Sequence, residues 1–138
     1  MKILIMGLPG SGKTTLAHAL SKLIDCIWYN ADVVRNRYDD WDFSKEGRLR
    51  QAARMKKLAD DSSGHVICDF VAPTKEIREL FDADYVIWVD IITQGRFDDT
   101  NKIFEPPKHY DIRVIEQDAE RWAAIIARAI SIKELNEG

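Results

Sequence analysis

The segment Gly7–Thr14 (GLPGSGKT) concentrates residue types that suit an anionic ligand. Its glycines let consecutive backbone N–H groups converge on one anion, and the amino end of a following helix adds positive potential there. A lysine can reach the terminal phosphates of a nucleotide, and a threonine hydroxyl can coordinate Mg²⁺. The segment satisfies G-x-x-x-x-G-K-[ST] at every position, which predicts a site for ATP and Mg²⁺. The expected nucleotide contacts are Gly7, Pro9, Gly10, Ser11, Gly12, Lys13, Thr14 and Thr15.

Two aspartates that follow apolar runs are candidate acid–base and metal-binding groups. Asp32 comes just after the run 26–29, and we expect it to accept a hydroxyl proton or to orient the attacking group. Asp69 lies in the run 65–70, where it could support Mg²⁺ binding or serve as an alternative base. Each also has a structural interpretation, Asp32 as a helix N-cap and Asp69 as the cap of the following turn. The expected metal-binding residues are Thr14, Asp32 and Asp69.

Basic residues crowd the stretch from 35 to 57, although the formal net charge of the chain is -3. They are Arg35, Arg37, Lys45, Arg48, Arg50, Arg54, Lys56 and Lys57. One interpretation is the solvated face of a helix, because acidic residues are interspersed with them. The other is an anion-binding surface beside the phosphate site.

The elements that position these residues follow from hydrophobic periodicity. Apolar runs predict strands at 2–6, 26–29, 65–70, 84–90 and 111–116. Helical spacing and start signals predict helices at 13–23, 44–60, 73–81 and 117–136, and a polar stretch occupies about 93–110. This alternation predicts an α/β fold, a three-layer α/β/α parallel sheet of about five strands of the P-loop NTPase type. In such sheets ligands bind at the carboxyl ends of the strands.

Length and composition narrow the class of protein further. At 138 residues the chain is expected to form one domain, 1–138. It has no apolar run of membrane-spanning length and no recognisable signal peptide, so we expect a cytoplasmic protein. We expect the protein to be a monomer or a homodimer. Cys26 and Cys68 lack metal-ligand spacing and are expected to be inert core thiols.

The chain resembles adenylylsulfate (APS) kinase and its P-loop relatives in four motifs that occur in the family's order. After the phosphate loop come Asn30–Arg35 (NADVVR), Phe43–Arg54 (FSKEGRLRQAAR) and Phe70–Lys75 (FVAPTK), and Lys102–Phe104 (KIF) fits the family's K-x-F lid motif. The resemblance implies an ATP- and Mg²⁺-dependent kinase that phosphorylates a hydroxyl. It implies that Lys13 and Asp32 are catalytic and that Arg96 is a lid arginine that stabilises the transferring charge. Substrate contacts implied in this way are Asp32, Arg35, Phe43, Arg48, Gln51, Phe70, Lys102 and Phe104, with the rings of Phe43 and Phe104 sandwiching a flat base.

Departures from the family bear on the acceptor. Gln51 replaces the family's Asn, Ala72 replaces a Ser, and the lid is short, which suits a bulky acceptor. The lid also resembles that of small viral kinases, some of which phosphorylate 5-hydroxymethyluracil bases within DNA. The preferred hypothesis is therefore a kinase of 5-hydroxymethyluracil in phage DNA, acting in an infected bacterial cell. Adenylylsulfate kinase, or another small-molecule kinase, is the alternative. A different class of function is a switch-type NTPase, which changes conformation on nucleotide hydrolysis. Such proteins are usually longer, so the short chain counts against this class.

Overall fold

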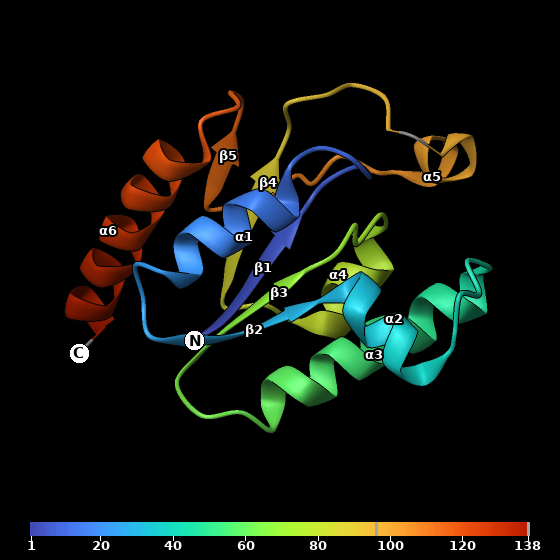
Figure 1. Cartoon of the computed structure of the whole chain (residues 1–138), viewed down its shortest axis with the longest axis horizontal. Coiled ribbons are helices and arrows are strands. Elements are labelled where there is room, and N and C mark those ends of the chain that lie inside the picture. The colour runs from blue at the N-terminus through green and yellow to red at the C-terminus, as the bar shows by residue number, and fades with distance from the viewer. Residues whose placement is uncertain (96, 138) are drawn as a thin grey trace.

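Five parallel strands form one sheet in the order β2-β3-β1-β4-β5 (Figure 1). The computed structural model describes residues 1–95 and 97–137. The strands are β1 (Lys2–Met6), β2 (Cys26–Asn30), β3 (His65–Asp69), β4 (Tyr85–Val89) and β5 (Ile112–Val114). The predicted five-stranded parallel α/β sheet is therefore confirmed.

Side chains of the strands alternate between two apolar clusters, one on each face of the sheet. Helices cover both faces and bury these clusters. The helices are α1 (Lys13–Ser21), α2 (Ala31–Tyr38), α3 (Lys45–Asp60), α4 (Lys75–Phe81), α5 (Asp98–Ile103) and α6 (Ala119–Glu137). Ile3 and Ile5 of β1 pack in the cluster formed with α1 and α6, which lie side by side (Figure 1). Leu4 and Met6 face the cluster formed with α3 and α4. Among the helices described, none is both long and apolar enough to cross a membrane.

Side-chain caps start helices α2, α3 and α4. Asn30 accepts a hydrogen bond from Val33 N, Ser44 from Gly47 N, and Thr74 from Ile77 N. Helix α1 has no such side-chain cap, so the amide groups of its first turn stay directed at whatever lies beyond its amino end.

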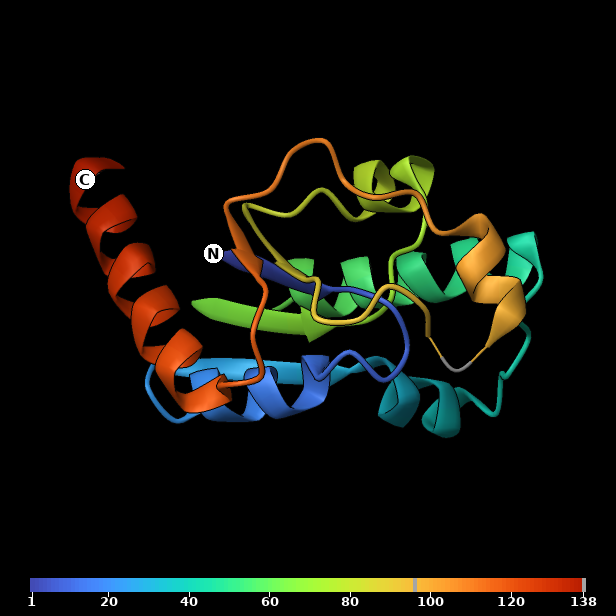
Figure 2. The ribbon, with the colours of Figure 1, turned by 90° about the horizontal axis from the view of Figure 1, so that it is seen from above.

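Two helices depart from the sequence prediction. α2 (Ala31–Tyr38) has too few apolar residues to give a periodic signal, and α5 (Asp98–Ile103) lies in the polar stretch for which no helix was predicted. Both lie beyond the carboxyl ends of the strands, as Figures 1 and 2 show. They therefore border the edge of the sheet where parallel α/β folds bind ligands.

Candidate active site

The phosphate loop lies between β1 and α1 and depends on glycine for its backbone path. Gly12 has φ 102°, although a Cβ there would meet no atom within 4 Å, so the need for glycine is conformational. At Gly7 the need is spatial, because a Cβ would lie 2.5 Å from the carbonyl oxygen of Val89. Lys13 is 9% exposed, and its Nζ donates to the carbonyl oxygen of Leu8 at 3.0 Å. The Lys13 ammonium group is thus held within the phosphate loop.

One continuous cleft of about 980 Å³ joins the phosphate loop to the region after β2 and β3. Among the expected nucleotide contacts, the cleft is lined by Pro9, Gly10, Gly12, Lys13, Thr14 and Thr15. Gly7 and Ser11 are buried and are not among the lining residues of the described chain. They shape the loop, while the other residues present it to a ligand.

A polar network around the buried Asp69 carboxylate connects the loop to the end of β3. The Thr14 hydroxyl donates to Asp69 Oδ1 at 3.3 Å, and Asn30 Nδ2 donates to the same carboxylate at 3.1 Å. Trp28 Nε1 donates to Asp69 Oδ2 at 2.6 Å. Burial raises the pKa of the Asp69 carboxyl above its usual value, while the hydrogen bonds from Trp28 and Asn30 act in the opposite direction.

This network fits a magnesium ion chemically. Mg²⁺ prefers hard oxygen ligands and keeps several waters, and a hydroxyl beside a carboxylate offers both a ligand and an acceptor for bound water. Thr14 would ligate the ion directly, and Asp69, already fixed by Trp28 and Asn30, would orient that ligand or a bound water.

Asp32 lies in the first turn of α2, exposed and lining the cleft. Its structural interpretation as the N-cap is wrong, because Asn30 fills that position. The Asp32 carboxylate is therefore left facing the cleft that also contains Lys13 and Thr14.

Two arginines flank the exposed ring of Phe43 on the acceptor side. The Arg35 guanidinium carbon lies 4.3 Å from the ring centroid and that of Arg48 lies 5.6 Å away. Arg48 Nε also donates to the Phe43 carbonyl at 2.8 Å, and its Nη2 donates to the Thr100 hydroxyl of α5 at 3.2 Å. Burial lowers the pKa of both guanidinium groups, yet both line the cleft. The acceptor region thus offers cations beside an aromatic ring.

Most of the remaining basic segment is paired with acids rather than presented to a ligand. Arg50 and Arg54 bind the Asp40 carboxylate, with closest N–O distances of 2.8 and 2.5 Å. In the same way Lys45 pairs with Glu76, Lys56 with Asp60, and Lys57 with Asp61. This arrangement favours the solvated, ion-paired face over a broad anion-binding surface.

A family model described as AAA domain matches residues 3–89 of the chain. The chain belongs to this family. The chain is 27% identical over 137 residues to a protein of Aeropyrum pernix named "Probable adenylyl-sulfate kinase", covering 88% of this chain and 72% of that protein. With this loop and fold, the AAA-domain chain is an ATP-dependent kinase of the P-loop type.

Solved structures of kinases share the fold of this AAA-domain chain. An APS kinase of Mycobacterium tuberculosis, solved with AMPPNP and APS, superposes with a TM-score of 0.75 at 20% identity, covering 94% of this chain and 97% of the other. A shikimate kinase of Aquifex aeolicus superposes with a TM-score of 0.70 at 20% identity, covering 98% and 99%.

The remaining predicted contacts of this kinase are distributed unevenly. Gln51 and Phe70 line the cleft; Gln51 is 4% exposed and its Nε2 donates to the Ala31 carbonyl at 3.0 Å. Phe104 instead packs against the apolar cluster of α3 and α4 and, with exposed Lys102, is not among the described residues that line the cleft. The expected sandwich of Phe43 and Phe104 is therefore not formed here. Arg96 lies outside the described residues.

The sequence analysis missed two residues of the site, Asn30 and Trp28, which hold the Asp69 carboxylate. Trp41 also lines the cleft, as its position beside the acceptor motif indicates. Asn30 carried a usable signal, because it is polar and directly follows an apolar run. Trp28 carried none, since a tryptophan in a strand is expected to be core and its contact with Asp69 joins two distant segments.

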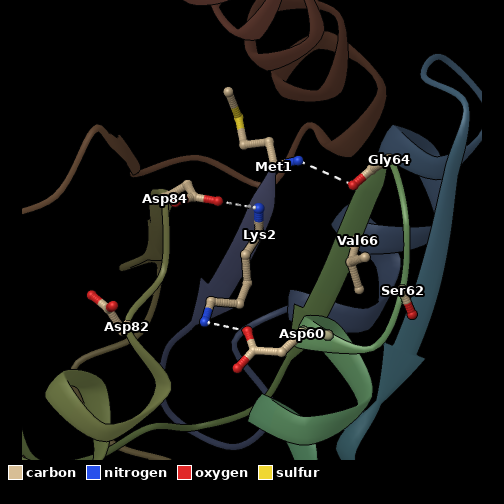
Figure 3. A pocket seen from close by; sticks show the side chains of 9 residues that line it. Met1, Lys2, Asp60, Ser62, Gly64, Val66, Asp82 and Asp84 are labelled. Atoms are coloured by element: carbon tan, nitrogen blue, oxygen red, sulfur yellow. Dashed lines mark hydrogen bonds and ion pairs between the residues drawn. The ribbon is translucent and has the colours of Figure 1, made fainter.

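A second, smaller hollow of about 240 Å³ lies at the opposite end of the sheet (Figure 3). There Lys2 Nζ contacts Asp60 Oδ1 at 2.8 Å, and Lys2 N donates to Asp84 Oδ2 at 2.7 Å. The amino group of Met1 donates to the Gly64 carbonyl at 3.0 Å. These contacts anchor the start of β1, which gives this hollow a structural role.

Replacement of Asp69 by asparagine should change how stability depends on pH. Because its pKa is raised in the folded protein, ionising Asp69 costs folding free energy as pH rises from the unfolded-chain value of about 3.9 through the folded value. That cost is fully present above the folded pKa. Without nucleotide, the melting temperature of Asp69→Asn minus that of the native protein should therefore become more positive from about pH 4 to about pH 7.

Calorimetry across that pH range measures this difference. Asp25→Asn, which replaces an exposed carboxylate between α1 and β2, serves as the control. Asp69→Asn should also raise the Mg²⁺ concentration needed for half-maximal turnover. Parallel melting profiles for Asp69→Asn and the native protein would contradict the assigned direction.

Proposed function

We propose that this kinase transfers the γ-phosphoryl group of ATP to a hydroxyl of a small anionic acceptor, and that adenylylsulfate is the first acceptor to test. The observation that carries the proposal is the continuous cleft, which runs from Lys13 and Thr14 past Asp32 to Arg35, Phe43 and Arg48. A phosphate-binding loop, the Asp32 carboxylate and an aromatic ring flanked by arginines therefore line the same cleft.

Each part has a chemical role in an in-line transfer. Lys13 and the amides at the start of α1 bind the β- and γ-phosphates and stabilise the charge that develops on them. Asp32 accepts the proton of the acceptor hydroxyl as its oxygen bonds to the γ-phosphorus, and the bond to the bridging oxygen of ADP breaks. Thr14, with support from Asp69, would hold Mg²⁺, which would supply positive charge against that of the phosphates. Arg35 and Arg48 bind the acceptor's anionic group.

The acceptor in this proposal differs from the one that the sequence analysis preferred. A DNA duplex requires a broad cationic surface because its affinity comes mainly from phosphate contacts. Here the salt bridges of the 35–57 stretch engage five of its eight basic residues. The resemblance to the Aeropyrum pernix protein also supports a small acceptor. Adenylylsulfate carries a hydroxyl, a flat base and an anionic group, which match Asp32, Phe43 and the two arginines.

The destination of a labelled phosphate tests the proposal. The protein is incubated with γ-labelled ATP and Mg²⁺ and, in parallel, with adenylylsulfate, 5-hydroxymethyluracil DNA and ordinary DNA. We expect label in adenylylsulfate and none in either DNA. Label confined to 5-hydroxymethyluracil DNA would restore the DNA-base hypothesis, and release of free phosphate alone would indicate a hydrolase.

A further inference from the structure

The segment 39–44, between α2 and α3, carries two half-exposed aromatic rings at the mouth of the cleft. Trp41 is 48% exposed and Phe43 is 52% exposed, and both line the cleft. Neither belongs to the two apolar clusters of the core. Large aromatic side chains stabilise a fold mainly by being buried, so folding alone does not account for either ring.

Three arginines brace this segment through its backbone and through the Asp40 side chain. Arg35 Nη1 donates to the carbonyl oxygens of Asp40 and Asp42 at 2.9 and 3.1 Å. The Asp40 carboxylate binds Arg50 Nε at 2.8 Å and Arg54 Nη2 at 2.5 Å. The segment is therefore held in one conformation although its aromatic rings are exposed.

Close packing adds to this bracing. A Cβ on Gly47 would overlap the backbone carbonyl of Asp42, so the segment lies directly on the first turn of α3. The side chain of Asp42 is also engaged, because its Oδ1 accepts from Ser44 N at 2.9 Å. Hydrogen bonds from Arg50 and Arg54 hold the pKa of Asp40 well below its usual range, so this carboxylate stays charged and paired.

The two rings differ in the groups that already contact their faces. Phe43 has the Arg35 guanidinium 4.3 Å from its centroid and Arg48 at 5.6 Å. Within residues 1–95 and 97–137, the Trp41 side chain makes no hydrogen bond and no contact with another ring. Its indole face is thus the more available apolar plane beside the cations of the cleft.

We propose that Trp41 contacts the acceptor by stacking on a flat ring, and that Asp40 is the positioning residue that holds Trp41 at the cleft mouth. This inference rests on the proposed function and narrows its substrate class to acceptors that combine a flat ring with an anionic group. A platform that is fixed before binding loses little entropy when the acceptor arrives, which is the advantage of the arginine bracing.

Steady-state kinetics of variants tests the role of Trp41. Trp41→Ala should raise the KM of the acceptor about 5- to 150-fold, the range expected for loss of one stacked ring, and leave the KM of ATP unchanged. Trp41→Phe should recover most of the loss, because a flat face is restored. Ile132→Ala, which removes an exposed apolar side chain of α6, is the control and should behave as native. An unchanged acceptor KM in Trp41→Ala would overturn the inference.

Asp40→Asn separates positioning from general structural damage. It should raise the acceptor KM while the KM of ATP and kcat at saturating acceptor stay near native, because the phosphate loop is untouched. If Asp40→Asn raised the KM of ATP and the KM of the acceptor equally, Asp40 would have only a structural role, and its assignment as a positioning residue would be overturned.

The choice of acceptor distinguishes failure of this inference from failure of the proposed function. The probes are adenylylsulfate, a 5-hydroxymethyluracil oligonucleotide, shikimate and gluconate. Each probe is added with ADP and Mg²⁺ to the native protein and to Trp41→Phe, and tryptophan emission is measured. A response to the oligonucleotide but not to adenylylsulfate, present only in the native protein, supports the inference and defeats the proposed function. No Trp41-dependent response to either flat-ring probe overturns the inference. Phosphorylation of shikimate or gluconate, measured in a parallel assay with ATP in place of ADP, overturns it as well.

Discussion

Replacing Lys13 by alanine is expected to lower kcat by at least about 10²–10³-fold, the usual cost of removing one charged or hydrogen-bonding group that stabilises a transition state. Lys13 is 9% exposed and lines the cleft at the start of α1, where phosphate charge would gather. Its ammonium already lies within the loop, 3.0 Å from the Leu8 carbonyl, so binding requires only a short movement. Turnover with γ-labelled ATP measures the effect.

The control for this change is Lys22→Ala, an exposed lysine at the opposite end of α1. It removes the same charge from the same helix and should leave kcat within about twofold of native. The far-UV circular dichroism of Lys13→Ala should match that of the native protein, because Lys13 contributes no apolar side chain to either core cluster. Near-native turnover in Lys13→Ala would remove the phosphate loop from the mechanism.

Replacing Asp32 by asparagine should lower kcat by about 10²–10⁴-fold, the range for a general base. The amide keeps the size of the side chain but cannot accept the acceptor proton. ATP binding should be preserved, since Asp32 belongs to α2 rather than to the phosphate loop. Turnover and the nucleotide dissociation constant are measured on the same preparation.

Asp39→Asn is the matched control for Asp32→Asn. Asp39 is exposed at the end of the same helix with φ 50°, a conformation that asparagine adopts readily, so fold and turnover should stay native. If Asp32→Asn turned over normally while Asp69→Asn did not, the base would be Asp69.

Local signals explain why most of the fold was predictable. The long helix that begins after Ser44 and the helix after Thr74 each combine apolar periodicity with a capping residue, and the strand at 2–6 is a short apolar run. α2 was missed because its eight residues bury only Val34 and Arg35. A helix held by one cap and by contacts with the rest of the chain leaves little periodic trace in its sequence.

The sequence by itself determined the phosphate loop, because the geometry of that loop arises from eight consecutive residues whose backbone preferences are local. It also determined the alternation of strands and helices, and thereby the edge of the sheet at which a ligand binds.

Only the tertiary structure decided which charges face the cleft. Asp40 reaches Arg50 and Arg54, 10 and 14 positions along the chain, and thereby removes two cations from the candidate acceptor site. Trp28 and Asn30 of β2 fix Asp69 of β3, at separations of 41 and 39 residues. Such pairings depend on how distant segments meet in space. Composition and spacing count the charges, but they do not show which of them neutralise one another.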